Sequence, residues 1–153
     1  MKLTQMTTSI KGEAIDMKWH LIDVKGKILG RIVPEIVKYL QGKNKTNYVD
    51  YLDMGDNVVV INAKKVKISG NKDKTKTYSS YSGYPGGLRF ETFASLMKKN
   101  PGEIIKHAVS GMLPKNKFRS VRLSRLFIFS DENHTFKEQF IKPALPAGRL
   151  KSS

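Results

Sequence analysis

The sequence predicts an α/β fold: a single domain whose helices pack on a small, mainly parallel sheet. The length of 153 residues fits one domain, and 39% hydrophobic residues can supply one core. The order strand, amphipathic helix, strand, with unbroken β-branched runs, is typical of buried parallel strands. We divide the chain into an N-terminal arm (1–17), an α/β domain (18–135) and a C-terminal tail (136–153), and we expect the termini to be extended.

The first half of the domain predicts a strand, a helix and a second strand. Residues 19–24 have strand composition and end at a Lys-Gly-Lys turn. Within residues 29–40 the apolar positions recur at spacings of three and one, which places them on one face of a helix. Pro34 would lie in the first turn if this helix begins near residue 30, and Gly42 can end it. Residues 57–62 predict a strand buried on both faces.

The second half predicts a long loop, two short helices and a last strand. Residues 70–89 show no hydrophobic period and predict a loop. Residues 91–99 and 101–111 predict helices, the second opened by Pro101. Residues 126–129 predict a last buried strand.

The charge is strongly positive and unevenly distributed. The chain has 28 Lys and Arg against 13 Asp and Glu, a net charge of +15. Residues 64–125 contain 15 of these cations and three acids, a difference of +12. Self-repulsion disfavours such a folded chain, and an ordinary solvated face interleaves both signs. We therefore expect a polyanionic partner, with nucleic acid favoured over an acidic protein or a membrane surface.

The sequence disfavours several classes of function. No apolar run approaches the length of a membrane span, and the lack of cysteine excludes disulfides, zinc ribbons and thiol catalysis. Residues 26–30 lie where a dinucleotide loop would lie but lack its glycine pattern. Asp50, Asp53 and Asp56 are more typical of turn and helix caps than of a magnesium site.

We accordingly expect no enzyme activity, no small-molecule substrate, no membrane association and no cofactor. Mg²⁺ bridging the protein to RNA phosphates is compatible with the sequence. A nucleotide-using enzyme on an α/β scaffold is kept as an alternative.

Two basic segments have the composition of RNA-binding surfaces. Residues 78–89 interleave tyrosine with glycine: glycine lets backbone amides approach phosphates, and tyrosine can stack on an unpaired base. The alternative is a glycine-rich turn whose tyrosines pack on the core. In the second segment, a helix that begins after Pro114 would place Lys115, Arg119 and Arg122 on one face, a cationic ridge suited to phosphates.

Several longer motifs carry a family resemblance. They are Trp19-x-x-Ile22-Asp23, Leu29-Gly30-Arg31, Tyr48 to Ala63 ending in GDNVVVINA, Gly70-Asn71-Lys72, GYPGGL (83–88) and AVSGMLPKN (108–116). In this order they resemble the large-subunit ribosomal protein 13 family of bacterial type, over about residues 18–130. The chain departs from the family pattern at Thr46, where proline is usual, and at residues 117–119.

The resemblance implies an α/β core and a structural, non-catalytic role in the large ribosomal subunit. The protein would bind and stabilise large-subunit rRNA during assembly and in translation, beside neighbouring large-subunit ribosomal proteins. Its place would be the ribosome of a bacterial cytoplasm or of a mitochondrial or other organellar matrix. A free regulatory RNA-binding module is the alternative to a ribosomal protein.

The residues expected to contact RNA fall into two groups. Those expected to contact phosphates are Lys43, Lys45, Lys72, Lys74, Arg89, Lys115, Lys117, Arg119, Arg122 and Arg125. Those expected to make close shape or base contacts are Tyr81, Tyr84, Gly86, Gly87, His107 and Asn116.

Overall fold

A computed structural model of the chain describes residues 16–141, so most of the predicted arm and tail lies outside the described residues. Its centre is a three-stranded sheet of β1 (Trp19–Asp23), β2 (Asn57–Ile61) and β5 (Leu126–Ile128), in the order β1-β2-β5. Both neighbouring pairs are parallel. The predicted single α/β domain with a small, mainly parallel sheet is confirmed.

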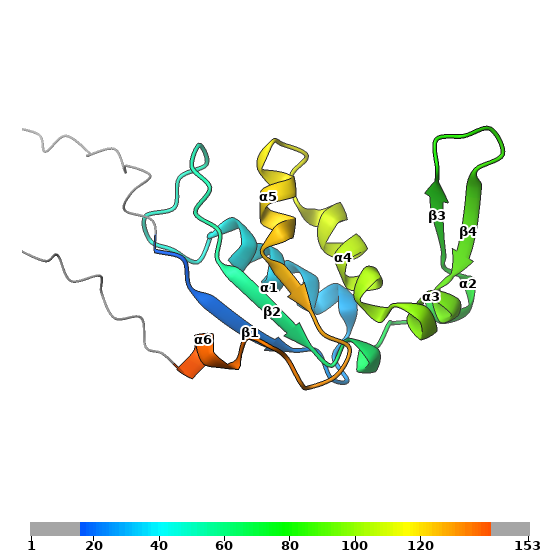
Figure 1. Cartoon of the computed structure of the whole chain (residues 1–153), viewed down its shortest axis with the longest axis horizontal. Helices are drawn as coiled ribbons and strands as arrows, with labels where there is room; N and C mark the ends of the chain where they lie inside the picture. Colours follow the sequence, from blue (N-terminus) through cyan, green and yellow to red (C-terminus); the bar gives the residue numbers. More distant parts are fainter. Residues whose placement is uncertain (1–15, 142–153) are drawn as a thin grey trace, which may run out of the picture.

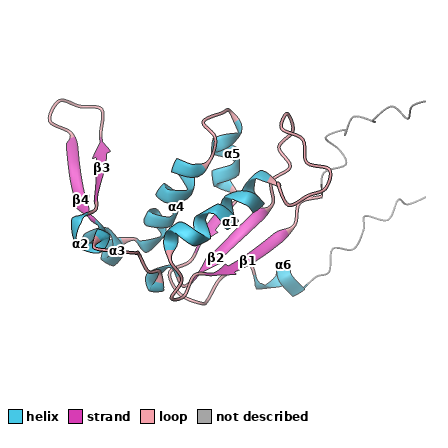
Figure 2. Ribbon diagram, turned by 180° about the vertical axis from the view of Figure 1, so that it is seen from behind, coloured by secondary structure: helices cyan, strands magenta, loops and turns pink. Residues whose placement is uncertain are grey.

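The core lies between one face of this sheet and the helices α1 (Leu29–Gln41) and α4 (Pro101–Met112) (Figure 2). Ile36 of α1 and Ile105 of α4 are fully buried. Val58, Val59 and Val60 in the central strand are also fully buried, so β2 is enclosed on both faces as its β-branched run predicts. Burial of each large aliphatic side chain contributes about 2 kcal/mol to folding.

The opposite face of the sheet is covered by aromatic side chains from the C-terminal segment. Trp19 of β1 stacks on Phe127 of β5, with ring centroids 5.6 Å apart. Phe136 and Phe140, the latter in α6 (Lys137–Ile141), lie 5.0 and 6.5 Å from the same indole ring. The residues of β5 are only half-buried, because this short segment covers less surface than a long helix would. The predicted last strand is therefore present, but it is half-buried where a buried strand was expected.

Helix α1 begins earlier than the position of Pro34 suggests. Ile28 is its N-cap, and the amide of Ile32 donates to the Ile28 carbonyl at 3.3 Å. Pro34 is therefore the sixth helical residue, beyond the first turn, and the Gly30 carbonyl loses its usual helical donor. Gly42 ends the helix in the left-handed region, at φ 77°, as expected of a C-terminal glycine.

The structure departs most from prediction between residues 70 and 92. The expected loop instead forms a short helix α2 (Lys72–Thr75) and an antiparallel hairpin of β3 (Thr77–Tyr81) and β4 (Leu88–Thr92). The hairpin extends away from the sheet, and most of its side chains are exposed (Figure 1). Of the residues in these two strands only Tyr78 packs against the core, so the strands lack the hydrophobic alternation by which a strand is recognised.

The two predicted short helices are present. Helix α3 (Phe93–Lys99) starts two residues later than expected, because Glu91 and Thr92 still pair with β3. The Thr92 hydroxyl then accepts a hydrogen bond from the Ser95 amide at 3.3 Å and caps the helix. Pro101 opens α4, as predicted.

Gly55 precedes β2 at a close approach between backbones, and its replacement tests this packing. A Cβ there would overlap the carbonyl of Leu40 in α1 and lie 3.0 Å from Arg125. We expect Gly55→Ala to lower the free energy of unfolding by about 2 kcal/mol or more. Gly30→Ala is the control, because a Cβ at this helical position meets nothing within 4 Å. It should raise stability by up to about 1 kcal/mol. Urea denaturation of both variants decides, and an unchanged Gly55→Ala midpoint would contradict the close approach.

Candidate nucleic-acid interface

Three segments that carry predicted RNA contacts project from the same side of the molecule (Figures 1 and 2). They are the loop 43–56, the connection 113–117 between α4 and α5 (Phe118–Ser124), and the hairpin tip 82–87. The loop 43–56 leads into β2, and α5 leads into β5. Because these strands are parallel, the loop and α5 lie together at their amino ends.

The loop 43–56 is held by Asp56, whose side chain is fully buried. One carboxylate oxygen lies 2.6 Å from Lys45 Nζ and accepts from the Lys18 amide at 3.1 Å. The other lies 2.8 Å from His20 Nε2, and the His20 ring stacks on Tyr39 of α1 with centroids 4.1 Å apart. Lys45 Nζ also donates to the Met54 carbonyl at 2.8 Å. Lys45 therefore supports its own loop in the free protein.

Asp53 joins the same loop to α5. Its carboxylate lies 3.3 Å from Arg122 Nε and 2.8 Å from Arg125 Nη2. Arg125 Nη1 also donates to the Gly55 carbonyl at 3.1 Å. Arg122 is only 2% exposed, so its charge is neutralised inside the protein.

The structure contradicts the predicted cationic ridge. Helix α5 begins at Phe118, so Lys115 lies in the preceding turn and shares no helical face with Arg119 and Arg122. Arg119 is half-buried and donates from Nη2 to the carbonyl and the hydroxyl of Ser110, both at 2.7 Å. The spacing was interpreted as if the helix continued from Pro114, but the Asn116 amide bonds to the Pro114 carbonyl in a turn.

The remaining predicted phosphate contacts are exposed cations: Lys43, Lys72, Lys74, Arg89, Lys115 and Lys117. In the part of the chain that the structure describes, none of these six has a carboxylate within ion-pair distance. They are thus available to an external anion. Phosphate contacts by four other cations stay predictions: Lys45, Arg119, Arg122 and Arg125. In the structure these side chains already bind groups of the protein itself.

The hairpin tip presents its tyrosines to solvent. Tyr81 is 66% and Tyr84 75% exposed, so neither packs on the core. The Gly87 amide donates to the Tyr84 carbonyl at 2.9 Å, and Gly86 adopts a positive φ of 73°, which favours glycine. Tyr78, at the base of the hairpin, is half-buried and lies edge-on to His107 of α4, with ring centroids 5.3 Å apart.

Sequence reasoning missed the roles of Asp53 and Asp56. Their pattern predicts turn caps, whereas Asp53 binds Arg122 and Arg125, and Asp56 binds Lys45 of its own loop and His20 of β1. In a very basic chain, a carboxylate that lies just before a buried apolar strand, as Asp56 does two residues before Val58, is the signal that could have indicated a buried ion pair.

The position of a dinucleotide loop is filled by backbone pairing. The Gly26 amide donates to the Lys65 carbonyl and the Leu29 amide to the Lys67 carbonyl, both at 2.9 Å. These amides are not free to bind a phosphate. Among residues 16–141, no group of three or more His, Cys, Asp or Glu could hold a metal ion. Within this same range, no helix is long and apolar enough to span a bilayer.

Comparison with known proteins gives one consistent result. The family described as ribosomal protein L13 matches residues 17–135. A large ribosomal subunit protein uL13 from a Nitratiruptor species is 45% identical over 139 residues, which cover 91% of this chain and 97% of the relative. The protein of the same name from Clostridioides difficile is 46% identical over 125 residues, 82% of this chain and 87% of the relative.

The buried carboxylate of Asp56 predicts a loss of stability in acid. Burial alone would raise the pKa of Asp56, but hydrogen bonds from His20, Lys45 and the Lys18 amide outweigh it and lower this pKa to about 2. The native state therefore binds this proton less readily than the unfolded chain. The resulting stability, about 2 kcal/mol, is present above about pH 4 and is lost as the pH falls towards 2.

Urea unfolding at fixed pH values between 5 and 2 measures this effect. The wild type should lose about 2 kcal/mol more than Asp56→Asn over the range from pH 4 to pH 2. Asp56→Asn should itself be less stable at pH 7 by about 3 kcal/mol, because Lys45 loses its buried partner. Asp73→Asn, at an exposed acid of α2, should follow the wild type. Equal acid sensitivity of wild type and Asp56→Asn would contradict the assignment.

Proposed function

The chain belongs to the ribosomal protein L13 family, and from this premise we propose that it binds and stabilises large-subunit rRNA during assembly and in translation. As a member of this structural, non-enzymatic family it is a constituent of the large ribosomal subunit. Its proposed partners are the rRNA and neighbouring large-subunit ribosomal proteins. No resident cofactor is part of the proposal, and Mg²⁺ would act only by bridging to rRNA phosphates.

The observation that carries the RNA-binding proposal is the arrangement of free cations at the amino ends of the parallel strands. Lys43 comes from the loop 43–56, and Lys115 and Lys117 come from the connection before α5. In the same loop, Asp53 and Asp56 are already neutralised by internal cations, and the exposed Asp50 accepts a hydrogen bond from the Tyr48 hydroxyl. This edge therefore presents an excess of positive charge to a polyanion.

The hairpin supplies a second set of proposed contacts. Arg89 is an exposed cation on β4, and Lys72 and Lys74 are exposed on α2 at the hairpin base. At the tip, Tyr81 and Tyr84 present rings that can stack on unpaired bases. Gly86 and Gly87 allow the RNA backbone to approach the turn closely, and Asn116 offers an exposed amide between Lys115 and Lys117.

The internally bound cations have a different part in this proposal. Arg122 and Arg125 fix α5 to the loop 43–56 through Asp53. Asp56 binds Lys45 within the loop and fixes the loop to β1 through His20. They set the spacing of the free lysines before RNA arrives. Such preorganisation reduces the conformational entropy that binding must remove.

A charge-removal experiment tests the phosphate contacts. Lys115→Ala with Lys117→Ala should lower the slope of log K against log salt for binding to in vitro transcribed large-subunit rRNA by about 1.5 to 2. The matched control is Lys65→Ala with Lys67→Ala, which removes the same charge from two exposed lysines that follow β2 and, among the described residues, have no ion-pair partner. This control should leave the slope within about 0.5 of wild type. Equal slopes for the two double variants would show that only total charge matters.

Sedimentation separates the ribosomal role from a free regulatory RNA-binding module. Tagged protein from cell extracts is centrifuged through sucrose gradients at about physiological salt and then at high salt. Co-migration with the large subunit under both conditions is the expected result. A peak at the top of the gradient at low salt would refute the ribosomal role and favour the free module.

A further inference from the structure

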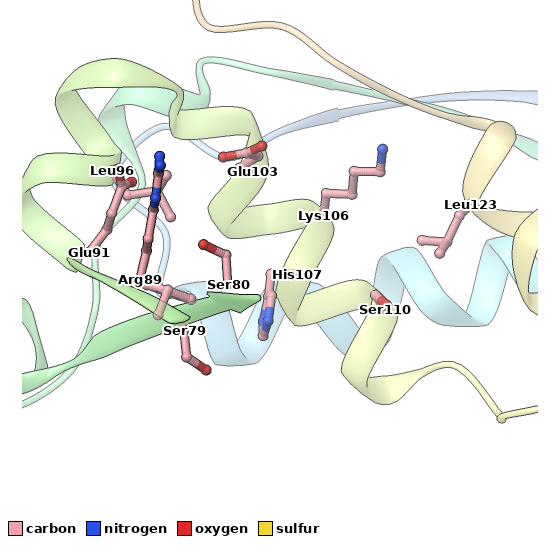
Figure 3. Close-up of a pocket in the computed structure, with 11 residues that line it drawn as sticks. Ser79, Ser80, Arg89, Glu91, Leu96, Glu103, Lys106, His107, Ser110 and Leu123 are labelled. Atoms are coloured by element: carbon pink, nitrogen blue, oxygen red, sulfur yellow. The ribbon is translucent and has the colours of Figure 1, made fainter. Parts of the chain in front are cut away.

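We propose that the cleft between the hairpin and α4 binds an unpaired nucleobase of the RNA, with preference for a base that carries an exocyclic amino group. The inference rests on the proposed function and adds to it a defined site and ligand. The cleft has a volume of about 530 Å³ and lies between β3 and β4 on one side and α4 on the other (Figure 3). Pockets of this size accommodate small organic ligands.

The hairpin face that is turned toward α4 is mainly polar, which is unusual for a face that packs against a helix. Side chains alternate along a strand, so Tyr78 and Ser80 of β3 share a face with their partners Glu91 and Arg89 of β4, and these four line the cleft. The opposite face carries Phe90, which is 67% exposed. If the hairpin docked on α4 only for stability, its apolar face would be the one turned inward.

Aromatic rings lie at the base of the cleft. Tyr78 is half-buried and meets His107 edge-on, at an interplanar angle of 81°. The His107 ring is exposed on α4 and lines the cleft together with the hairpin residues Ser79 and Ser80 (Figure 3). An exposed planar ring next to hydroxyl groups provides both a stacking surface and hydrogen-bond partners, which is how unpaired bases are bound.

The charges of the cleft distinguish a base site from a phosphate site. The exposed cations Arg89 and Lys106 line it together with the exposed carboxylate of Glu103. Glu91 is neutralised by Lys99 at 2.6 Å, but among the described residues Glu103 has no ion-pair partner. A carboxylate repels phosphate, whereas it accepts hydrogen bonds from the amino groups of adenine, cytosine and guanine. Uracil has no such group, which gives the predicted preference.

Nucleotide titration of the full-length protein, followed by NMR, tests the site directly. The probes are AMP, CMP, UMP and ribose 5-phosphate, and the signals are the His107 ring and the backbone amides of residues 78–80 and 106–110. AMP and CMP should shift these signals with dissociation constants in the millimolar range, and UMP should bind at least about 3-fold more weakly. Ribose 5-phosphate should leave the His107 ring signals unshifted.

Two variants connect the effect to named side chains. Glu103→Gln should reduce the preference for AMP over UMP to less than about 2-fold, since an amide oxygen is a weaker acceptor than a carboxylate. Glu35→Gln, at an exposed glutamate of α1, is the matched control and should keep the preference. His107→Ala should weaken AMP binding at least about 5-fold, because the stacking ring is lost.

Three results would overturn the inference. They are no shift at the cleft with any nucleotide, equal shifts with ribose 5-phosphate, and an unchanged AMP preference in Glu103→Gln. The salt dependence of rRNA binding by the same preparations distinguishes this failure from failure of the proposed function. If the Lys115 and Lys117 contribution to that slope persists while the cleft does not bind, only the base site is refuted. If the wild-type protein shows no salt-dependent binding to the rRNA at all, the proposed function is refuted as well.

Discussion

Neutralisation of two carboxylates in the loop 43–56 is the constraint on which the arrangement of the basic segments depends. Asp56 ties the loop to β1 through His20 and to its own Lys45, while Asp53 ties it to α5 through Arg122 and Arg125. Buried pairs of this kind add little net stability, but removal of one partner leaves a buried charge and costs several kcal/mol, on the order of 3 to 5. The loop and α5 are therefore held in one arrangement. In a chain of net charge +15, this brings two basic segments side by side despite their repulsion.

The location of the basic edge separates this protein from α/β enzymes. Ligands of open α/β sheets usually bind at the carboxyl ends of the strands. Here those ends are closed by backbone hydrogen bonds: the Ala63 amide after β2 donates to the Phe129 carbonyl after β5 at 3.1 Å, and Gly26 pairs with Lys65. The amino ends carry the loop 43–56 and α5 instead. The same scaffold thus presents a charged edge rather than a crevice, which suits recognition of a large polyanion better than chemistry on a small molecule.

Hydrophobic periodicity was enough to predict the elements that build the core, and it failed where no core is involved. The apolar face of α1 and the β-branched run of β2 could be predicted directly, since burial selects their residues. The hairpin could not, because both its strands are exposed. Similarly, the sequence alone does not distinguish Arg122 from Lys117, because both are cations in the same basic segment. Only the fold shows that Arg122 meets Asp53, 69 residues away in sequence, while Lys117 stays exposed. Which cation is free is a tertiary property.

The outward-facing apolar side of the hairpin affects the solubility of the protein before it is assembled into a ribosome. A two-stranded ribbon has two unpaired edges, and here Tyr81, Leu88 and Phe90 form an apolar face in solvent. Such a surface is prone to pair with other copies of the same chain and to precipitate. A cell that made this protein faster than its partners would accumulate unassembled, aggregation-prone protein. If the protein and its partners were made in equal amounts, the concentration of unassembled protein would stay low. The exposed hairpin therefore ties the solubility of the protein to balanced synthesis.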